Sequence, residues 1–523
     1  MKKINLFFAA ALTFFVSCAS DDTVNKDNEQ EPDTKGLTGF VEEDNATRTT
    51  AEYDGSGLNF YWTHGDRLWV NTGTATSPVL TQDDHNNINS KLENNPANSS
   101  AVKRIDKAKF YFAGTFTASS YPVRYTGKNG VSNKVTIEKQ QSQTIPNDAS
   151  HIGEDGDCGI ATATKPTGSE AYVFTLTHKA AYATFLPFNS PGEIKGAKIT
   201  KINVSANEAI AGTYNFTDNG LDLTSPTSTS NSIEFTLSNN FYLPKAVTAK
   251  ANAATMVITP GTYTNFTVEY TLHDPATGVG TTITKTYPSV TFTAGKNKKV
   301  HTDLQVTVYP GDKYYMWDAK QQYWYGYEWT KNLPAGIGQP TLIGPPAGNY
   351  PQNNSNPRYY NESFPDNGIS NPAVNSCKDL PNANEMVWYA QKGDPRWDAN
   401  KLWATMGHLY KGGMWFKKKS KINGFNANAA PDGTDWRTTD NIDNWPASQT
   451  LPSAADAGNY FYLPLMGYYH SGLLNDVGNF GYYWSSSAGP WNSDYAYYLF
   501  ISSGSVYVSN YYRYNGFRVG VFE

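Results

Sequence analysis

The sequence is poor in cysteine. Its 523 residues include only three, Cys18, Cys158 and Cys377, which lie far apart along the chain. Exported proteins that depend on disulfide bonds for stability usually carry more cysteines at this length. One bridge between Cys158 and Cys377 stays open, but we expect two free thiols in separate domains. The cores must then be stabilised by burial of apolar surface, and the chain is long enough for three or four domains.

Charge and metal-binding patterns are also scarce. Only 17% of the residues are charged and the net charge is −5, so electrostatics gives no reason to expect nucleic acid or an anionic membrane as a partner. The eight histidines show neither an i, i+4 pair nor the spacing of metal ligands. We therefore expect no catalytic site, no cofactor and no resident metal, and an enzyme is the least favoured alternative.

Long apolar runs are absent too, apart from a short one near the start. Lys2 and Lys3 precede the apolar stretch Leu6–Val16, which is shorter than the roughly 20 residues that a membrane-spanning helix needs. The stretch is typical of a secretory signal. The residues before Cys18 resemble a lipobox, although Phe15 stands where that pattern prefers leucine. We predict a lipoprotein signal peptide over 1–18 with Cys18 lipidated; an ordinary signal peptide with an incidental cysteine is the alternative.

The next segment, 19–35, is polar and acidic. It has no hydrophobic period and cannot bury enough surface to order itself, so we predict a solvated tether. Its Ser20-Asp21-Asp22 resembles the acidic export signal of Bacteroidetes lipoproteins. Together with Cys18, this resemblance predicts an outer-membrane lipoprotein precursor at the cell surface, held by acyl chains.

Glycine, proline and aromatic residues are plentiful, with 43 Gly, 29 Pro and 14% aromatic residues. This composition favours strands joined by turns. Phe266, Val268, Tyr270 and Leu272 alternate with polar neighbours, and a similar alternation runs over 300–308. The chain is therefore predicted to be mainly β, with one β-sandwich over 36–170 and a second over 171–309.

The character of the sequence changes after Pro310. Eleven of the thirteen tryptophans fall within 310–523, which predicts a separate aromatic-rich domain there. One amphipathic helix is expected, over Asn382–Tyr389, because its apolar residues recur at helical spacing.

Several short motifs resemble the Bacteroidetes fimbrillin family. In chain order they are Gly39-Phe40-Val41, Ala46-Thr47-Arg48-Thr49-Thr50, Phe60 to Val70, Phe174 to Ala181, and Phe292 to Val308. The resemblance covers about 36–308. It implies two transthyretin-like sandwiches and assembly as a type V pilus, in which other pilin subunits are the partners.

The resemblance also implies how assembly begins. An arginine-specific protease cuts after Arg48, before Thr49, and frees the first strand; a strand from another subunit then fills the open groove by donor-strand exchange. We predict a short edge strand near 37–41 and an exposed loop around Glu42-Glu43-Asp44, because an unpaired edge binds another chain readily. If residues 37–47 lay in the middle of a sheet, the pilus account would fail, and an aromatic-rich surface receptor on a lipid anchor would remain. The alternative is that Arg48 is a surface arginine in a linker.

The last domain resembles the Fibrobacter-paralogous, DUF1566-like domain, which is C-type-lectin-like and α+β. The motifs are Cys377 to Tyr389, Tyr462 to Tyr468, Gly481 to Ser487, Ala496 to Phe500 and Gly516 to Val519. We expect Val519–Glu523 to close this domain as a strand. A subunit without a C-terminal donor strand ends the fibre, so the analogy predicts a pilus tip with an adhesive domain.

Exposed aromatic side chains of this domain are candidates for binding a host or bacterial surface glycan or protein, because they bury a large area at low entropic cost. For any single one of these residues, however, a place in the core is the favoured interpretation. The predicted ligand-binding residues are Trp436, Trp445, Trp491, Asp494 and Tyr495.

Four carboxylates, Asp432, Asp435, Asp440 and Asp443, offer oxygen ligands for calcium, but a solvated acidic loop is the favoured interpretation. Taken together, the sequence favours an adhesive tip subunit of a pilus. A shaft or accessory subunit, and a surface lipoprotein that binds glycan or protein without polymerising, stay open.

Overall fold

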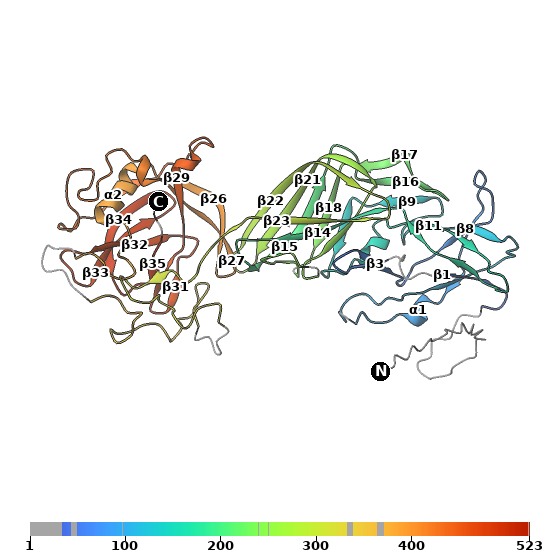
Figure 1. Ribbon diagram of the computed structural model, residues 1–523, viewed down its shortest axis with the longest axis horizontal. Coiled ribbons are helices and arrows are strands. Elements are labelled where there is room, and N and C mark those ends of the chain that lie inside the picture. The colour runs from blue at the N-terminus through green and yellow to red at the C-terminus, as the bar shows by residue number, and fades with distance from the viewer. Residues whose placement is uncertain are drawn as a thin grey trace, which may run out of the picture.

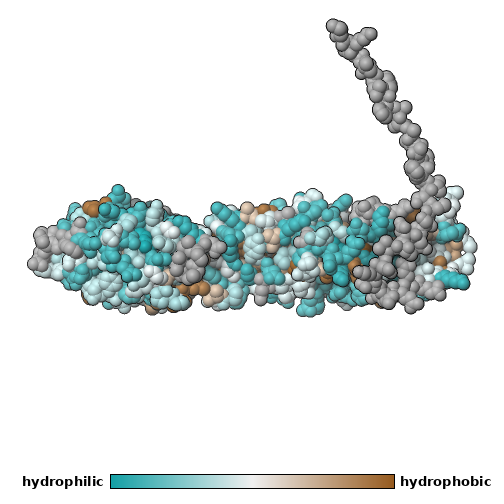
Figure 2. Space-filling view, turned by 90° about the horizontal axis from the view of Figure 1, so that it is seen from below, coloured by the Kyte–Doolittle hydropathy of each residue, from teal (hydrophilic) through white to brown (hydrophobic). Residues whose placement is uncertain are grey.

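A computed structural model shows an elongated, mainly β molecule (Figure 1). It describes residues 34–42, 50–96, 98–238, 240–248, 250–331, 338–362, 371–520 and 522. Cys18, Arg48, Thr49 and nearly all of the predicted tether lie outside the described residues. The face in Figure 2 is mainly hydrophilic where residues are described, with only scattered hydrophobic side chains. None of the described helices has the length and apolar character needed to cross a bilayer.

The first unit is built on a nine-stranded sheet. Its apolar face packs around Trp62, Phe110 and Tyr125, which are fully buried. The neighbouring strands run in the order β5 (Leu80–Gln82), β4 (Trp69–Asn71), β8 (Ser120–Tyr125), β11 (Gly159–Thr164), β12 (Tyr172–Phe174), β1 (Thr38–Glu42), β7 (Lys109–Phe112) and β6 (His85–Asn86), with β13 (Thr177–His178) paired to β11. A short helix, α1 (Ile88–Lys91), follows β6.

The second unit consists of three sheets around one large core. The first has the order β10 (Gln140–Gln143), β18 (Ser232–Leu237), β15 (Ile194–Ser205), β21 (Gly261–Asp274) and β22 (Val279–Phe292), with β19 (Tyr242–Leu243) paired to β15. The others are β20 (Ala254–Ile258), β14 (Ala181–Phe188) and β23 (Asn297–Asp303), and β17 (Gly220–Ser230), β16 (Ala211–Thr217) and β9 (Lys134–Ile137).

The chain passes between these two units more than once. β9 and β10 hydrogen-bond to β16 and β18 of the second unit, after which β11 returns to the first sheet. The hairpin of β2 (Thr50–Tyr53) and β3 (Leu58–Tyr61) places Ala51 and Phe60 in the second unit's core. Hydrogen-bonded strands thus cross the boundary predicted near residue 170.

The period-two pattern around residue 270 is confirmed, because Phe266, Val268, Tyr270 and Leu272 are all buried along β21. The alternating run over 300–308 is not one strand. It breaks at Gln305, whose φ of 57° is left-handed, and the residues beyond form β24 (Thr307–Tyr309). β24 pairs in parallel with a strand of the C-terminal unit.

The C-terminal unit has two main sheets and one longer helix, α2 (Ala383–Lys392). The predicted helix is confirmed: Asn382 caps it by accepting from Glu385 N, and the Glu385 side chain accepts from Asn382 N. One sheet has the order β24, β26 (Arg396–Thr405), β27 (His408–Lys417) and β29 (Tyr460–Pro464). The other has the order β25 (Tyr314–Tyr315), β35 (Phe517–Arg518), β32 (Gly481–Ala488), β33 (Tyr495–Ile501), β34 (Ser505–Tyr512) and β28 (Asp443–Pro446), and a separate hairpin joins β30 (Tyr468–His470) to β31 (Leu473–Asn475).

A polar contact joins the second and C-terminal units. The buried Asp274 carboxylate accepts from Leu409 N at 3.0 Å and lies 3.0 Å from His408 Nδ1. Burial acts to raise the pKa of Asp274, but the hydrogen bonds from His408 and Leu409 hold it below its ordinary value. Lys411 Nζ donates to the carbonyl of Gly280 at 2.6 Å. The two units therefore meet through paired groups rather than through a loose linker.

Cys158 and Cys377 are free thiols, both fully buried and in separate units, as predicted. Burial raises the pKa of both thiols, that of Cys377 to about 12. Low-pKa, accessible thiolates are the reactive ones, so these two are poor nucleophiles in the folded chain.

Candidate functional site

The first candidate site surrounds β1. β1 pairs in parallel with β12 on one side and antiparallel with β7 on the other. The edge-strand prediction for 37–41 is therefore wrong: β1 is an interior strand. Its partners lie about 70 and 130 residues further along the chain, and the local pattern carries no signal of strands so distant.

The side chains of β1 are packed into the first unit. Phe40 is fully buried, with its ring stacked 4.8 Å from that of Tyr172 and edge-on to Phe112 at 4.9 Å. Glu42 is also fully buried and accepts a hydrogen bond from the indole of Trp62. The expected exposed loop therefore cannot begin at Glu42, which pairs with the indole instead of facing solvent; residues 43 and 44 lie outside the described residues.

The chain on the far side of the predicted cut belongs to a different unit. β2 begins at Thr50, and Ala51 forms a bridge with Ala149. The backbone N–H of Tyr53 donates to Asn147 Oδ1 at 3.1 Å. The predicted cleavage site thus falls between a strand of the first sheet and a hairpin that packs on the second unit. A cut there leaves β1 held by non-covalent contacts alone.

The C-terminal end packs into its own unit. The closing strand is β35, which pairs with β25 and β32, so the strand predicted over 519–523 is wrong in its extent. Phe522 lies beyond it, with its ring 5.6 Å from Tyr389 and 5.9 Å from Phe461. Val519 N donates to the carbonyl of Lys313 at 2.9 Å, so backbone pairing and the packing of the Phe522 ring both hold the described residues of this segment.

The predicted ligand-binding residues do not form one group. Trp436 is only 4% exposed, so it is wrong as a ligand-binding candidate and fills the core, which is the interpretation favoured for any single one of these aromatic residues; its ring centroid lies 6.3 Å from that of Trp445, which is half-buried. Trp491 is 59% exposed. Asp494 is exposed, and Tyr495 is half-buried with its ring 4.6 Å from that of Tyr512.

The four aspartates proposed as calcium ligands are used in local contacts. Asp435 forms an ion pair with Arg437 at 2.8 Å, and this hydrogen bond lowers the pKa of Asp435. Asp432 accepts from the hydroxyl and backbone of Thr434. Within the described part of the chain, no three His, Cys, Asp or Glu side chains are placed to hold a metal ion.

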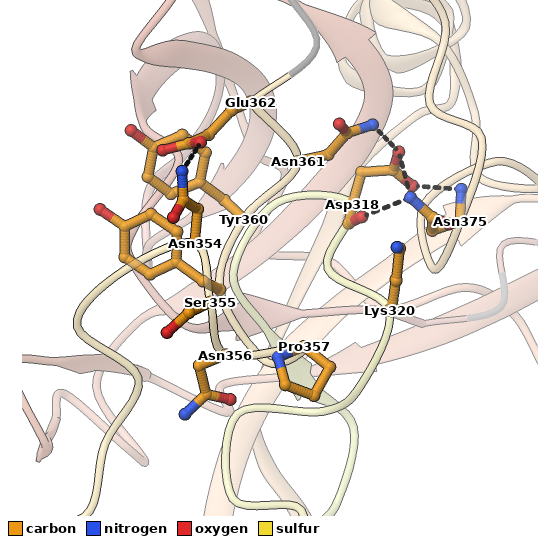
Figure 3. Close-up of a pocket in the computed structure, with 11 residues that line it drawn as sticks. Asp318, Lys320, Asn354, Ser355, Asn356, Pro357, Tyr360, Asn361, Glu362 and Asn375 are labelled. Atoms are coloured by element: carbon orange, nitrogen blue, oxygen red, sulfur yellow. Dashed lines mark hydrogen bonds between the residues drawn. The ribbon is translucent and has the colours of Figure 1, made fainter.

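A second candidate site, missed from the sequence, is a pocket of about 540 Å³ in the C-terminal unit (Figure 3). Asn354, Tyr360 and Glu362 lie on one side of it, and Lys320 and Asn375 on the other. The signal that could have revealed it is a run of amide, hydroxyl and tyrosine side chains over 352–362. These groups are the ones that bind polar ligands.

Buried Asp318 holds one wall of this pocket in place. Its carboxylate accepts from Asn361 Nδ2 at 2.8 Å, from the backbone N–H of Val374 at 2.8 Å and from that of Asn375 at 2.6 Å. A further bond comes from the backbone N–H of Cys377 at 3.2 Å. The carboxylate therefore serves to fix the wall that carries Asn375 and is not available to bind a ligand.

The opposite wall is fixed by Arg358, which is buried. Its Nη1 donates to the carbonyls of Asn349 and Tyr323, at 2.8 and 3.1 Å. Arg513 donates from Nη1 to the carbonyl of the pocket residue Asn361 and from Nε to that of Tyr495. One predicted residue, Tyr495, is thus connected to the pocket through a buried arginine.

No family model matches the chain, and a search of curated proteins found no match. Solved structures do resemble it weakly. A candidate cell adhesion protein from Bacteroides ovatus is 12% identical, covers 51% of this chain and 93% of its own, and has a TM-score of 0.29. A fimbrial assembly protein from Parabacteroides distasonis is 9% identical, covers 51% of this chain and 90% of its own, and has a TM-score of 0.27. The fimbrial anchor protein Mfa2 from Porphyromonas gingivalis is 10% identical, covers 47% of this chain and 82% of its own, and has a TM-score of 0.18. TM-scores this low carry no argument about fold or function.

Proposed function

We propose that the chain is an adhesive subunit of a surface fimbria, assembled by replacement of β1. Its precursor is anchored in the outer membrane through a lipid on Cys18. A protease cuts between Arg48 and Thr49, β1 leaves, and a strand of another subunit takes its place. The C-terminal unit, whose end packs into its own core, faces outward at the tip and carries the adhesive surface.

The observation that carries this proposal is that the predicted cut falls between β1 and the hairpin of the second unit, so that a cut there leaves β1 held by non-covalent contacts alone. β1 is the only strand described before residue 48, and it lies between two partners with its ring side chain buried. Burial of a phenylalanine such as Phe40 stabilises a fold by about 1.5–3 kcal/mol. Loss of β1 would expose the rings of Phe112 and Tyr172 together with the unpaired backbone of β7 and β12, and such a slot binds another strand.

The interior position changes the expected mechanism. A strand with hydrogen-bonded partners on both sides does not leave as readily as an edge strand, since both ladders must open. An incoming strand can reform both ladders, however, so the exchange is balanced in hydrogen bonds. β12 helps, because it has only three residues and shares a single registered pair with β11. β1 and β12 are therefore joined to the rest of the sheet on the β11 side by few backbone contacts.

The test is limited digestion of the lipid-free precursor with an arginine-specific protease, followed by size analysis and mass spectrometry. We expect cleavage after Arg48, loss of the 19–48 fragment and formation of oligomers, or capture of a strand peptide from a fimbrial shaft subunit. Arg48→Ala should stay monomeric. Arg48→Lys is the matched control, because it keeps the charge but not the protease specificity. Cleavage after Arg48 with the fragment retained and no oligomers or capture would falsify the exchange step.

A second candidate is a surface lipoprotein that binds its ligand without polymerising. The interior position of β1 favours it, because a strand paired on both sides can be a permanent part of the sheet. In that case the cut chain keeps its N-terminal fragment and remains monomeric. The same digestion therefore separates the two functions.

A further inference from the structure

We infer that the pocket lined by Asp318, Lys320, Asn354, Tyr360, Glu362 and Asn375 binds a neutral carbohydrate. This inference deepens the adhesive part of the proposed function and rests on it for its biological role. The binding itself does not depend on cleavage or polymerisation, since every residue that lines the pocket belongs to the C-terminal unit.

The size and rigidity of the pocket suit a small ligand. About 540 Å³ falls within the roughly 300–1,000 Å³ typical of ligand sites. Both walls are held by buried charged side chains that are themselves hydrogen-bonded, Asp318 on one side and Arg358 on the other. A preformed pocket loses little conformational entropy when a ligand enters.

The polar groups of the pocket match hydroxyl groups. Asn354 Nδ2 donates to Glu362 Oε2 at 2.6 Å, which leaves Asn354 Oδ1 and Glu362 Oε1 as acceptors. A sugar hydroxyl can donate and accept at once, so it can satisfy amide and carboxylate groups that lie side by side. Asn356 and Ser355 line the same wall; Asn356 Oδ1 accepts from Arg358 N and Nε and the Ser355 hydroxyl donates to Asn353 Oδ1, so they add an amide donor and a hydroxyl acceptor.

The charge of the pocket favours a neutral ligand. Asp318 is occupied by five hydrogen bonds, so the remaining ionic groups are one ammonium, on Lys320, and one carboxylate, on Glu362. The ammonium of Lys320 and the carboxylate of Glu362 act on a charged ligand with opposite signs, so the pair gives neither an anion nor a cation a net Coulombic advantage. A neutral polyol can bind to both by hydrogen bonds, which are strengthened when one partner is charged.

The aromatic side of the pocket supplies an apolar surface. The rings of Tyr359 and Tyr360 are half-buried and 4.5 Å apart, with 32° between their planes. Such rings can pack against the C–H face of a sugar while their hydroxyls bond to its rim. Burial raises the pKa of Tyr360, and its neighbour Tyr359 raises it further. The hydroxyl of Tyr360 therefore remains a donor at neutral pH.

The test is a printed glycan array probed with the uncut, lipid-free chain, followed by calorimetric titration of the strongest neutral oligosaccharide. We expect neutral glycans to bind in preference to sialylated and sulfated ones. Glu362→Ala and Asn354→Ala should each weaken binding about tenfold, which corresponds to about 1.4 kcal/mol. Glu362→Gln, which retains a hydrogen-bonding side chain, should recover most of the affinity.

Asn444→Ala is the matched control, because Asn444 is exposed on β28 and does not line the pocket. It should bind as the unaltered chain does. The inference is overturned if no neutral glycan binds, if only charged glycans bind, or if both alanine variants retain full affinity while remaining folded by circular dichroism. Each of these results leaves the exchange of β1 untouched, because the chain is never cut.

Discussion

At the scale of single residues, Cys377 illustrates how burial controls chemistry. Its sulfur accepts from the backbone N–H of Asp318 at 3.3 Å, and burial raises its pKa to about 12. At pH 8 the thiolate is rare and inaccessible. We predict that iodoacetamide labels neither Cys377 nor Cys158 in the folded, lipid-free chain within an hour, whereas both react in guanidinium chloride. Mass spectrometry of the alkylated chain measures this directly.

Rapid labelling of Cys377 under native conditions would contradict its burial and the packing of the wall beside it. Cys158 is the internal comparison, since it is equally buried but lies in another unit. Labelling of only one thiol would therefore identify the unit that opens.

Residue-scale expectations from the sequence succeeded where the environment is local. The two free thiols followed from the scarcity of cysteine, whereas the burial of Trp436 did not follow from its turn-rich surroundings. Trp436 packs against Tyr497 and Trp445, which come from β33 and β28. A contact between elements that are separated in the chain leaves no trace in the few residues around it.

At the scale of elements, β1 is the decisive strand. We predict that Phe40→Ala destabilises the first unit by about 3–5 kcal/mol, because it leaves a cavity beside Tyr172 and Phe112. Val79→Ala, at a position 57% exposed, should change stability by less than about 0.5 kcal/mol. Denaturant unfolding followed by tryptophan fluorescence measures both, with Trp62 and Trp69 as the reporters of the first unit.

After cleavage at Arg48 the same Phe40→Ala substitution should make the N-terminal fragment dissociate faster. A Phe40→Ala chain as stable as the unaltered one would show that β1 contributes little to the first unit. Removal of β1 would then not create a groove that binds another strand.

The elements also show how far sequence patterns reach. β21 was predictable because its period of two is visible over consecutive residues, and α2 because its apolar residues recur at helical spacing. The interior place of β1 and the crossing of β9 and β10 into the second unit were not predictable. Pairing between distant strands depends on tertiary packing, and the pattern within one strand does not name its neighbours.

At the scale of the whole molecule, the contact of Asp274 with His408 and Leu409 holds two units together. The pKa of Asp274 is lower in the folded chain than its ordinary value of about 3.9. The ionised carboxylate therefore stabilises the junction fully at pH values above that ordinary pKa. The stabilisation is lost as the pH falls through the lower pKa of the folded chain. We predict that small-angle X-ray scattering finds the same elongated particle from pH 8 to pH 5 and a looser one near pH 3.

Asp274→Asn should weaken the junction at neutral pH and remove this part of the acid response, since the amide does not titrate over that range. An identical particle at all pH values for the unaltered chain, or an unchanged acid response in Asp274→Asn, would show that apolar packing alone holds the units. Ala404 and Leu409, which join the second unit's core from β26 and β27, supply that packing.

The short strand β24 has a mechanical consequence. Residues 307–309 connect the second and C-terminal units, yet they are themselves part of the C-terminal sheet, paired with 403–405 of β26. A pulling force between a cell and a ligand bound to the C-terminal unit would therefore act at this connection on the hydrogen bonds between β24 and β26, because 307–309 do not form a flexible linker. The connection between the two units would stay stiff under tension until the hydrogen bonds between β24 and β26 break.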